Sequence, residues 1–294
     1  MNPTQRSEFL RKEANRLGFT QVGISKAERL DNAAIQLEKW LAGGYHGQMK
    51  YMENHFEKRV DPRKLVPGAK SVISLLYNYY TPQKQKDNEA PKISMYALGE
   101  DYHHVIKKQL RALVHKLQVS FGDFAARIFV DSAPVMEREW AARGGLGWIG
   151  RHTLAIHPRK GSYFFLAEII LDIDFEYDQP IRDHCGTCTK CIDACPTQAI
   201  SSNGYVLDAS RCISYLTIEL KEAIPAEFEN QMDQWMFGCD VCQQVCPWNR
   251  FSEKHQEASF EPKSELLEMT KRDWLELTQE VFRDLFGKSA VKRT

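Results

Sequence analysis

The feature that most constrains this chain is the placement of its eight cysteines, none of which occurs before position 185. The first four form a Cys-x2-Cys-x2-Cys-x3-Cys-Pro run. The last three repeat its end as Cys-x2-Cys-x3-Cys-Pro, and one cysteine lies alone between the two groups. In chain order they are Cys185, Cys188, Cys191, Cys195, Cys212, Cys239, Cys242 and Cys246.

This spacing is typical of polypeptides that bind two [4Fe–4S] clusters in the manner of bacterial ferredoxins. Three thiolates two residues apart can reach three corners of one cubane, while the fourth points toward the second cluster. The isolated cysteine completes the shorter group, so eight ligands serve two clusters. The cross-over predicts one quartet of Cys185, Cys188, Cys191 and Cys246, and another of Cys195, Cys212, Cys239 and Cys242.

The alternative interpretation of the cysteines is two structural zinc sites, since Cys-x2-Cys pairs also bind zinc. Zinc does not favour a third cysteine at the same spacing followed by Cys-Pro.

Disulfides are not expected, because the polar N-terminal segment 1–17 does not resemble a secretory signal and the protein should be cytoplasmic. No apolar run approaches the roughly 20 residues of a membrane span, so we expect no membrane partner. Basic and acidic residues number 39 each, so net charge gives no argument for a nucleic-acid partner.

The part before the cysteines alternates between helical and strand patterns, which predicts an α/β or α+β domain. Helices are expected over 3–18, 32–42, 101–119 and 133–143, and strands over 20–25, 71–80, 125–130 and 163–171. We expect a first domain over residues 1–178, a ferredoxin-like domain over 179–260 and a short helical C-terminal segment over 261–294. Periodicity alone does not order the strands.

The segment from Ile128 to Thr153 contains the most unusual chemistry outside the cysteines. An apolar strand delivers Asp131 at its end, where a desolvated carboxyl group can act as a proton donor. The alternative is that Asp131 or Ser132 caps the following helix. The glycines between Gly144 and Gly150 either allow close approach of a flat ligand or make a tight helix-to-strand connection.

A second polar group begins the helix expected over 101–119. Asp101 can be its N-cap, and Tyr102 is a second plausible proton-relay or substrate contact. Adjacent histidines do not face one way on a helix, so one of His103 and His104 should be buried and the other solvated.

Longer stretches of the sequence resemble the epoxyqueuosine reductases. They are VDSAPVMEREWAARGGLGWIGRHT, HPRKGSYFFLAEI, HCGTCTKCIDACPTQAI, CISYLTIE and GCDVCQQVCPWN. The resemblance implies an oxidoreductase that reduces epoxyqueuosine in tRNA to queuosine, the last step of queuosine biosynthesis. It also implies that the first domain binds base-off cobalamin, reduced through the two clusters, with a fold similar to that of reductive dehalogenases. Many members continue into a helical-repeat domain that helps to grip tRNA. The segment 261–294 would be either the end of a short member or the start of such a domain.

The resemblance also implies roles for single residues. Asp131 matches the family's proton donor. Positions near the corrinoid are His152, Thr153, Ser162, Ser214 and Asp240, and positions on the substrate side are Tyr102, Arg138 and Lys221. An external low-potential electron donor would be needed, and we expect a monomer. Two other functions stay open at this point: a cobalamin and iron–sulfur reductase that acts on a small molecule, as reductive dehalogenases do, and a two-cluster electron carrier without corrinoid.

Overall fold

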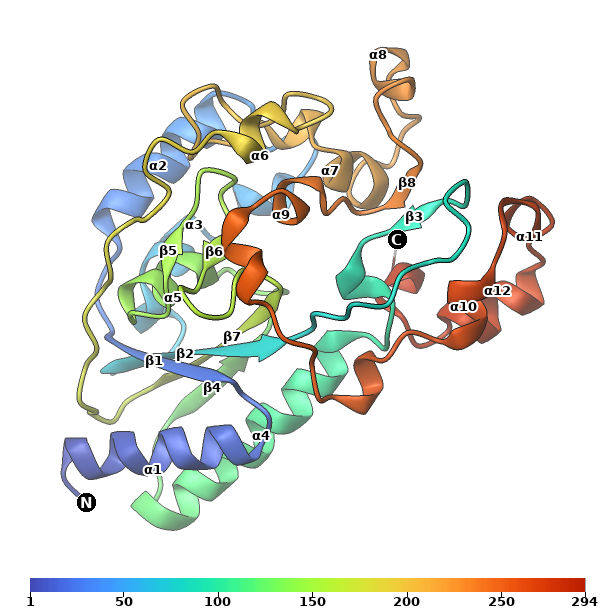
Figure 1. Cartoon of the computed structure of the whole chain (residues 1–294). Helices are drawn as coiled ribbons and strands as arrows, with labels where there is room; N and C mark the ends of the chain where they lie inside the picture. The colour runs from blue at the N-terminus through green and yellow to red at the C-terminus, as the bar shows by residue number, and fades with distance from the viewer. Residues whose placement is uncertain (294) are drawn as a thin grey trace.

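The computed structural model describes residues 1–293 and is built around a four-stranded sheet between two layers of helices (Figure 1). The strands lie in the order β1 (Gln21–Lys26), β2 (Ser71–Asn78), β7 (Phe164–Leu171) and β4 (Ala126–Phe129), and all neighbours pair antiparallel. Helices α1 (Pro3–Arg16) and α4 (Tyr102–Phe121) cover one face. Helices α2 (Asp31–Ala42) and α5 (Glu137–Arg143) cover the other.

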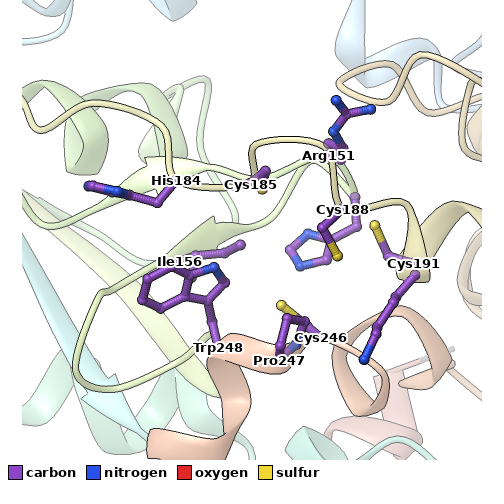
Figure 2. A pocket seen from close by; sticks show the side chains of 11 residues that line it. Arg151, Ile156, His184, Cys185, Cys188, Cys191, Cys246, Pro247 and Trp248 are labelled. Atoms are coloured by element: carbon purple, nitrogen blue, oxygen red, sulfur yellow. The ribbon is translucent and has the colours of Figure 1, made fainter.

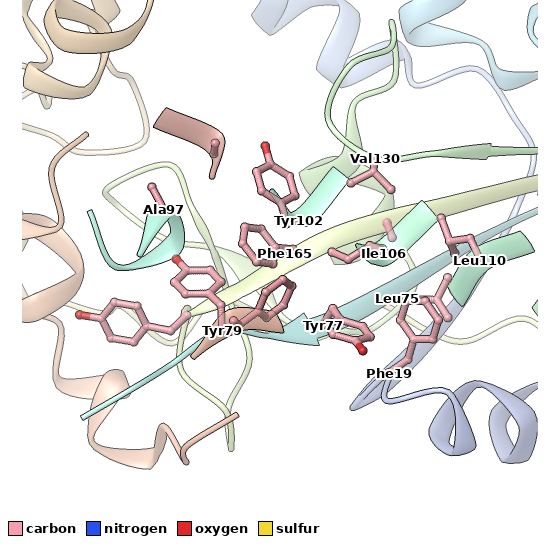
Figure 3. Close-up of a cluster of buried hydrophobic side chains, with 14 of the residues drawn as sticks. Phe19, Leu75, Tyr77, Tyr79, Ala97, Tyr102, Ile106, Leu110, Val130 and Phe165 are labelled. Atoms are coloured by element: carbon pink, nitrogen blue, oxygen red, sulfur yellow. The ribbon is translucent and has the colours of Figure 1, made fainter. Parts of the chain in front are cut away.

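Both faces of the central strands are buried, which explains why β2 and β7 are almost continuously apolar. Ile73 and Leu75 pack toward α4, where they meet Ile106 and Leu110 (Figure 3). Val72 faces the opposite side and packs near Trp140 of α5. The mixed α/β class predicted for this part is therefore confirmed.

Helix α5 approaches the edge strand β1 closely because two glycines meet there. A Cβ atom placed on Gly23 would lie 2.4 Å from the carbonyl oxygen of Gly144, the residue that ends α5. The glycine-rich segment after α5 then leads into the hairpin of β5 (Trp148–Ile149) and β6 (Ala155–Ile156). The tight helix-to-strand connection is thus one role of these glycines.

The cysteine-containing region consists of short helices and loops that lie above the sheet in Figure 1. Strand β8 (Trp235–Phe237) pairs parallel with β3 (Lys92–Ile93) and so joins this region to the N-terminal part. The remaining α-helices are α3 (Phe56–Val60), α6 (Lys190–Asp193), α7 (Ile213–Ile218), α8 (Ala226–Glu229) and α9 (Val241–Gln244). Turns of 3₁₀ helix span Lys50–Met52, Pro62–Lys64, Met95–Ala97, Ala209–Arg211, Pro247–Phe251, Ala258–Phe260 and Ala290–Arg293.

One expectation about a helix is wrong. The helix expected over 133–143 begins only at Glu137, because residues 131–135 form tight turns closed by backbone hydrogen bonds from Ala133 to Asp131 and from Val135 to Ala133. The segment expected to be helical over 261–294 contains α10 (Ser264–Glu268), α11 (Lys271–Leu275) and α12 (Gln279–Phe286), since Thr270 and Thr278 each cap a new helix. These three helices pack onto the same core as α4.

Within residues 1–293, every helix is too short or too polar to cross a lipid bilayer.

Candidate active site and metal centres

The first cysteine quartet lines one cavity. Cys185, Cys188 and Cys191 come from the loop and first turn around α6, while Cys246 arrives from the second cysteine group (Figure 2). The indole N–H of Trp148 donates to Cys185 Sγ at 3.4 Å. The other residues that line the cavity are Arg151, His152, Ile156, His184, Lys190, Pro247 and Trp248.

The second quartet gathers around the start of α9. Cys239 and Cys242 flank the start of α9, and both interact electrostatically with Cys195 and Cys212. Burial, reinforced by the neighbouring thiols, raises the pKa of Cys239 to about 12 and that of Cys242 well above its ordinary value. The structure therefore brings the eight cysteines together in the two groups that the spacing predicts.

Among residues 1–293, no three Cys, His, Asp or Glu side chains converge closely enough to hold one metal ion.

Asp131 lies two residues after the end of β4 (Phe129), in a turn that the sequence pattern did not predict. Its backbone is left-handed, with φ of 58°, a conformation that aspartate tolerates better than most residues. The N-cap of α5 is Met136, without a side-chain cap, so neither Asp131 nor Ser132 caps this helix. The capping interpretation is therefore wrong, and the Asp131 side chain is 63% exposed.

Two side chains from the first turn of α4 hold the Asp131 carboxylate. The hydroxyl of Tyr102 donates to Asp131 Oδ2 at 2.7 Å, and His103 Nε2 lies 3.4 Å from the same oxygen. The other ring nitrogen of His103 lies 2.7 Å from Oδ1 of Asp101, which also caps α4. Burial and the Asp131 charge raise the pKa of Tyr102 far above its ordinary value, so the phenol stays protonated.

The Tyr102 ring is fixed by stacking. It lies parallel to Phe165 of β7 with ring centroids 4.1 Å apart (Figure 3). Tyr96 contacts both rings edge-on. Of the two adjacent histidines, His103 is buried and His104 is exposed, as the helical spacing predicts.

His152 and Thr153, both predicted near the corrinoid, adjoin the first cysteine cavity. The ring of His152 is buried and its Nδ1 accepts the Leu154 N–H at 3.2 Å. Its Nε2 is then the protonated nitrogen, and it has no hydrogen-bond partner among residues 1–293. The carbonyl oxygen of Thr153 accepts a hydrogen bond from Arg138, whose side chain is exposed.

Ser162 and Asp240 instead join the cysteine region to the first domain. The Ser162 hydroxyl accepts from the amides of Gln243 and Asn249, both at 3.0 Å. The buried Asp240 carboxylate accepts from the Ser94 hydroxyl and, at 2.7 Å, from the Met95 N–H. Burial raises the pKa of Asp240 to about 6.

The last two predicted contacts flank α7. Ser214 is half-buried in its first turn, two residues after Cys212, and Lys221 is exposed beyond its end. His103, Glu137 and Glu168 were not predicted as site residues. For Glu168 a signal was available, since it is a carboxylate inside an apolar strand.

Comparisons with known proteins agree with this geometry. A family model described as "Epoxyqueuosine reductase QueG, DUF1730" matches residues 59–132, and one described as "4Fe-4S double cluster binding domain" matches residues 184–249. The epoxyqueuosine reductase of Cellulophaga algicola is 57% identical over 288 residues, which cover 98% of this chain and 94% of the relative. The chain belongs to the epoxyqueuosine reductase family.

Solved structures of family members have the same fold. A selenomethionine-labelled epoxyqueuosine reductase superimposes with a TM-score of 0.89 at 34% identity, covering 99% of this chain and 78% of that one. Another, solved with an epoxyqueuosine-modified tRNA-Tyr stem loop, gives 0.87 at 34% identity and covers 98% and 77%. A catabolic reductive dehalogenase gives 0.53 at 17% identity over 87% of this chain and 33% of that one, which shows a shared fold.

Family membership settles the kind of cofactor. The region 184–249 binds two [4Fe–4S] clusters, so the zinc interpretation is wrong. Epoxyqueuosine reductases are cobalamin-dependent, and the residues present fit such a group. Arg138 interacts electrostatically with Asp131 and with His152. Asp131 and Arg138 are exposed, and the buried Nε2 of His152 has a proton that a large ligand could accept.

Proposed function

We propose that this protein reduces epoxyqueuosine in tRNA to queuosine, with Asp131 as the proton donor. The observation that carries the proposal is the geometry at Asp131, an exposed carboxyl group held by Tyr102 and His103 in a member of this family. A solved relative binds an epoxyqueuosine-modified tRNA stem loop, which supports the same substrate here.

The reaction removes the epoxide oxygen and leaves an alkene. Both carbon–oxygen bonds break, two electrons and two protons enter, and the oxygen leaves as water. When bound, cobalamin and the two clusters would together supply a strongly reducing, nucleophilic centre. Asp131 delivers a proton to the departing oxygen, while Tyr102 and His103 hold the Asp131 carboxyl group in one orientation.

The remaining residues are assigned by their position. We place His152, Thr153, Ser162, Ser214 and Asp240 on the corrinoid side, and Tyr102, Arg138 and Lys221 on the substrate side. Ser162 and Asp240 would contribute to corrinoid binding only indirectly, because their polar atoms already bind protein groups. The ligands of one cluster are Cys185, Cys188, Cys191 and Cys246, and those of the other are Cys195, Cys212, Cys239 and Cys242.

The turn that carries Asp131 is not part of a helix, so it can move once the hydrogen bond from the Asp131 amide to Glu137 of α5 opens. In a solved Bacillus subtilis relative, the loop of the catalytic aspartate is swung out of the active site. We propose the same freedom for the Asp131 turn, with the inward position stabilised by Tyr102. The protein would act as a monomer in the cytoplasm and take electrons from an external low-potential donor.

The test is mass spectrometry of tRNA after anaerobic incubation with the cluster-loaded protein, cobalamin and a low-potential reductant. The expected result is loss of one oxygen atom from the modified base, with no dehalogenation of a halogenated phenol under the same conditions. An unchanged base, in the presence of protein that retains both clusters and corrinoid, would overturn the proposal.

A further inference from the structure

Two glutamates that the proposed mechanism does not use, Glu137 and Glu168, lie close to Asp131. Glu137 is the first residue of α5, and its Oε1 accepts the backbone N–H of Asp131 at 2.6 Å. This hydrogen bond closes the turn between β4 and α5, where the Asp131 backbone is left-handed. Glu137 therefore determines where the Asp131 backbone lies relative to α5.

Glu168 is the more unusual of the two. It lies in the middle of β7, paired with Ser74 of β2 and Phe129 of β4, and it is completely buried. Among residues 1–293, no hydrogen-bond donor reaches either of its carboxylate oxygens. An ionised carboxylate without donors is strongly unfavourable in such surroundings. Protonation of Glu168 removes the unfavourable buried charge and makes its carboxyl group a hydrogen-bond donor.

The acceptor for that proton is the Glu137 carboxylate, which lies within hydrogen-bonding reach of Glu168. Burial, together with the neighbouring carboxylates, raises the pKa values of both glutamates. A state in which the two carboxyl groups share a single proton is therefore favoured near neutral pH. His103 faces Glu137 from α4. The other titratable or charged groups around this site are Asp131, Tyr102, Tyr51 and Arg138.

We propose that Glu168 keeps a proton and donates it in a hydrogen bond to Glu137. Glu137 is then held as an anion and acts as a positioning residue for Asp131. Glu137 then has two effects. It holds the Asp131 amide, which keeps the turn in place, and its negative charge disfavours loss of the Asp131 proton before the epoxide oxygen leaves. The second effect rests on the proposed function, whereas the protonation of Glu168 does not.

The first experiment therefore measures protonation directly. Infrared difference spectra at neutral pH compare the anaerobic cluster-loaded wild type with Glu168→Gln, an isosteric change. Loss of a protonated carboxyl C=O band is expected. Glu13→Gln is the matched control, because Glu13 is equally buried but lies 2.5 Å from Arg16 and 3.6 Å from Lys116. The Glu13→Gln change should remove only carboxylate bands. If Glu168→Gln also removed only carboxylate bands, the proposal would be overturned.

The second experiment follows epoxyqueuosine turnover against pH in three variants. Glu168→Gln still donates to Glu137, so its rate should remain close to that of the wild type. Glu168→Leu removes the donor and should lower turnover about tenfold, as expected for one hydrogen bond. Glu137→Gln removes the negative charge, so the alkaline limb of the profile should move to lower pH by about one unit.

Unchanged turnover in Glu168→Leu together with an unshifted limb in Glu137→Gln would overturn the positioning role. If Glu168→Leu does not fold, the two glutamine variants still decide the matter, because both are isosteric. A wild type that leaves the tRNA base intact would instead refute the proposed function, and the infrared result would stand on its own.

Discussion

At the scale of single residues, Asp131 illustrates how a local conformation places an acid. The left-handed backbone turns the chain away from β4 before α5 begins, which leaves the carboxyl group exposed while its partners Tyr102 and His103 are buried. An acid in this arrangement is held by the protein on one side and accessible to a ligand on the other.

Asp131→Asn is expected to lower turnover of epoxyqueuosine by roughly 10²–10⁴-fold, the usual contribution of a general acid. Asparagine also tolerates left-handed backbone, so the turn and both clusters should be retained. The measurement is single-turnover kinetics with iron and corrinoid content determined in parallel. Asp123→Asn, an exposed carboxylate just before β4, is the control and should behave as the wild type. Full activity in Asp131→Asn would remove Asp131 from the mechanism.

Tyr102→Phe tests the hydrogen bond to Asp131 without disturbing the stack on Phe165. A hydrogen bond between neutral groups contributes about 0.5–1.5 kcal/mol, so turnover should fall roughly twofold to tenfold. Corrinoid binding should change little, which equilibrium titration would show. The control is Tyr177→Phe, whose hydroxyl bonds to the Lys70 carbonyl far along the sheet. Equal losses in the two variants would contradict a specific role for Tyr102.

At the scale of elements, the sequence predicts best where one pattern extends over many positions. The strands around Ile73 and Ile169 were predicted from nearly continuous apolar runs, and the helix around Ile106 was predicted from apolar residues at helical spacing. The strand order was not predictable, since it depends on contacts between distant segments. The late start of α5 was missed because glutamate and alanine favour helix, whereas the tight turns over 131–135 depend on hydrogen bonds that residue type does not reveal.

The contact between β1 and α5 provides a test at the same scale. Gly23→Ala would place a methyl group 2.4 Å from the Gly144 carbonyl oxygen, so the helix must shift. Such overpacking typically costs about 1–3 kcal/mol, and the midpoint of chemical unfolding should fall accordingly. Gly43→Ala is the control, because its new methyl group would meet the exposed Tyr45 side chain at 3.0 Å and the Lys39 carbonyl oxygen only at 3.4 Å. A stable Gly23→Ala variant would show that α5 can withdraw without cost.

At the scale of the whole molecule, the two cofactor systems are connected through polar and aromatic contacts. Asp240, next to Cys239, binds the backbone of the segment that carries Tyr96, and Tyr96 packs against Tyr102. Tyr102 in turn donates to Asp131. The region that binds the clusters thus helps to position the acid, so the cysteine-containing part and the sheet form one functional unit.

The cross-over of Cys246 is the whole-molecule feature that spacing and structure both indicate, and paired substitutions test it. Cys188→Ala with Cys246→Ala removes two ligands of one cluster and should leave about half of the iron, roughly four atoms per chain. Cys188→Ala with Cys195→Ala alters neighbours in the same sequence run but removes one ligand from each cluster. That pair should perturb both clusters, which electron paramagnetic resonance of the reduced protein would reveal as loss of both native signals. If the Cys188 and Cys246 pair abolished both signals and the Cys188 and Cys195 pair spared one, each sequence run would bind its own cluster. The connection between the two halves of the cysteine region would then have to come from packing rather than from a shared ligand set.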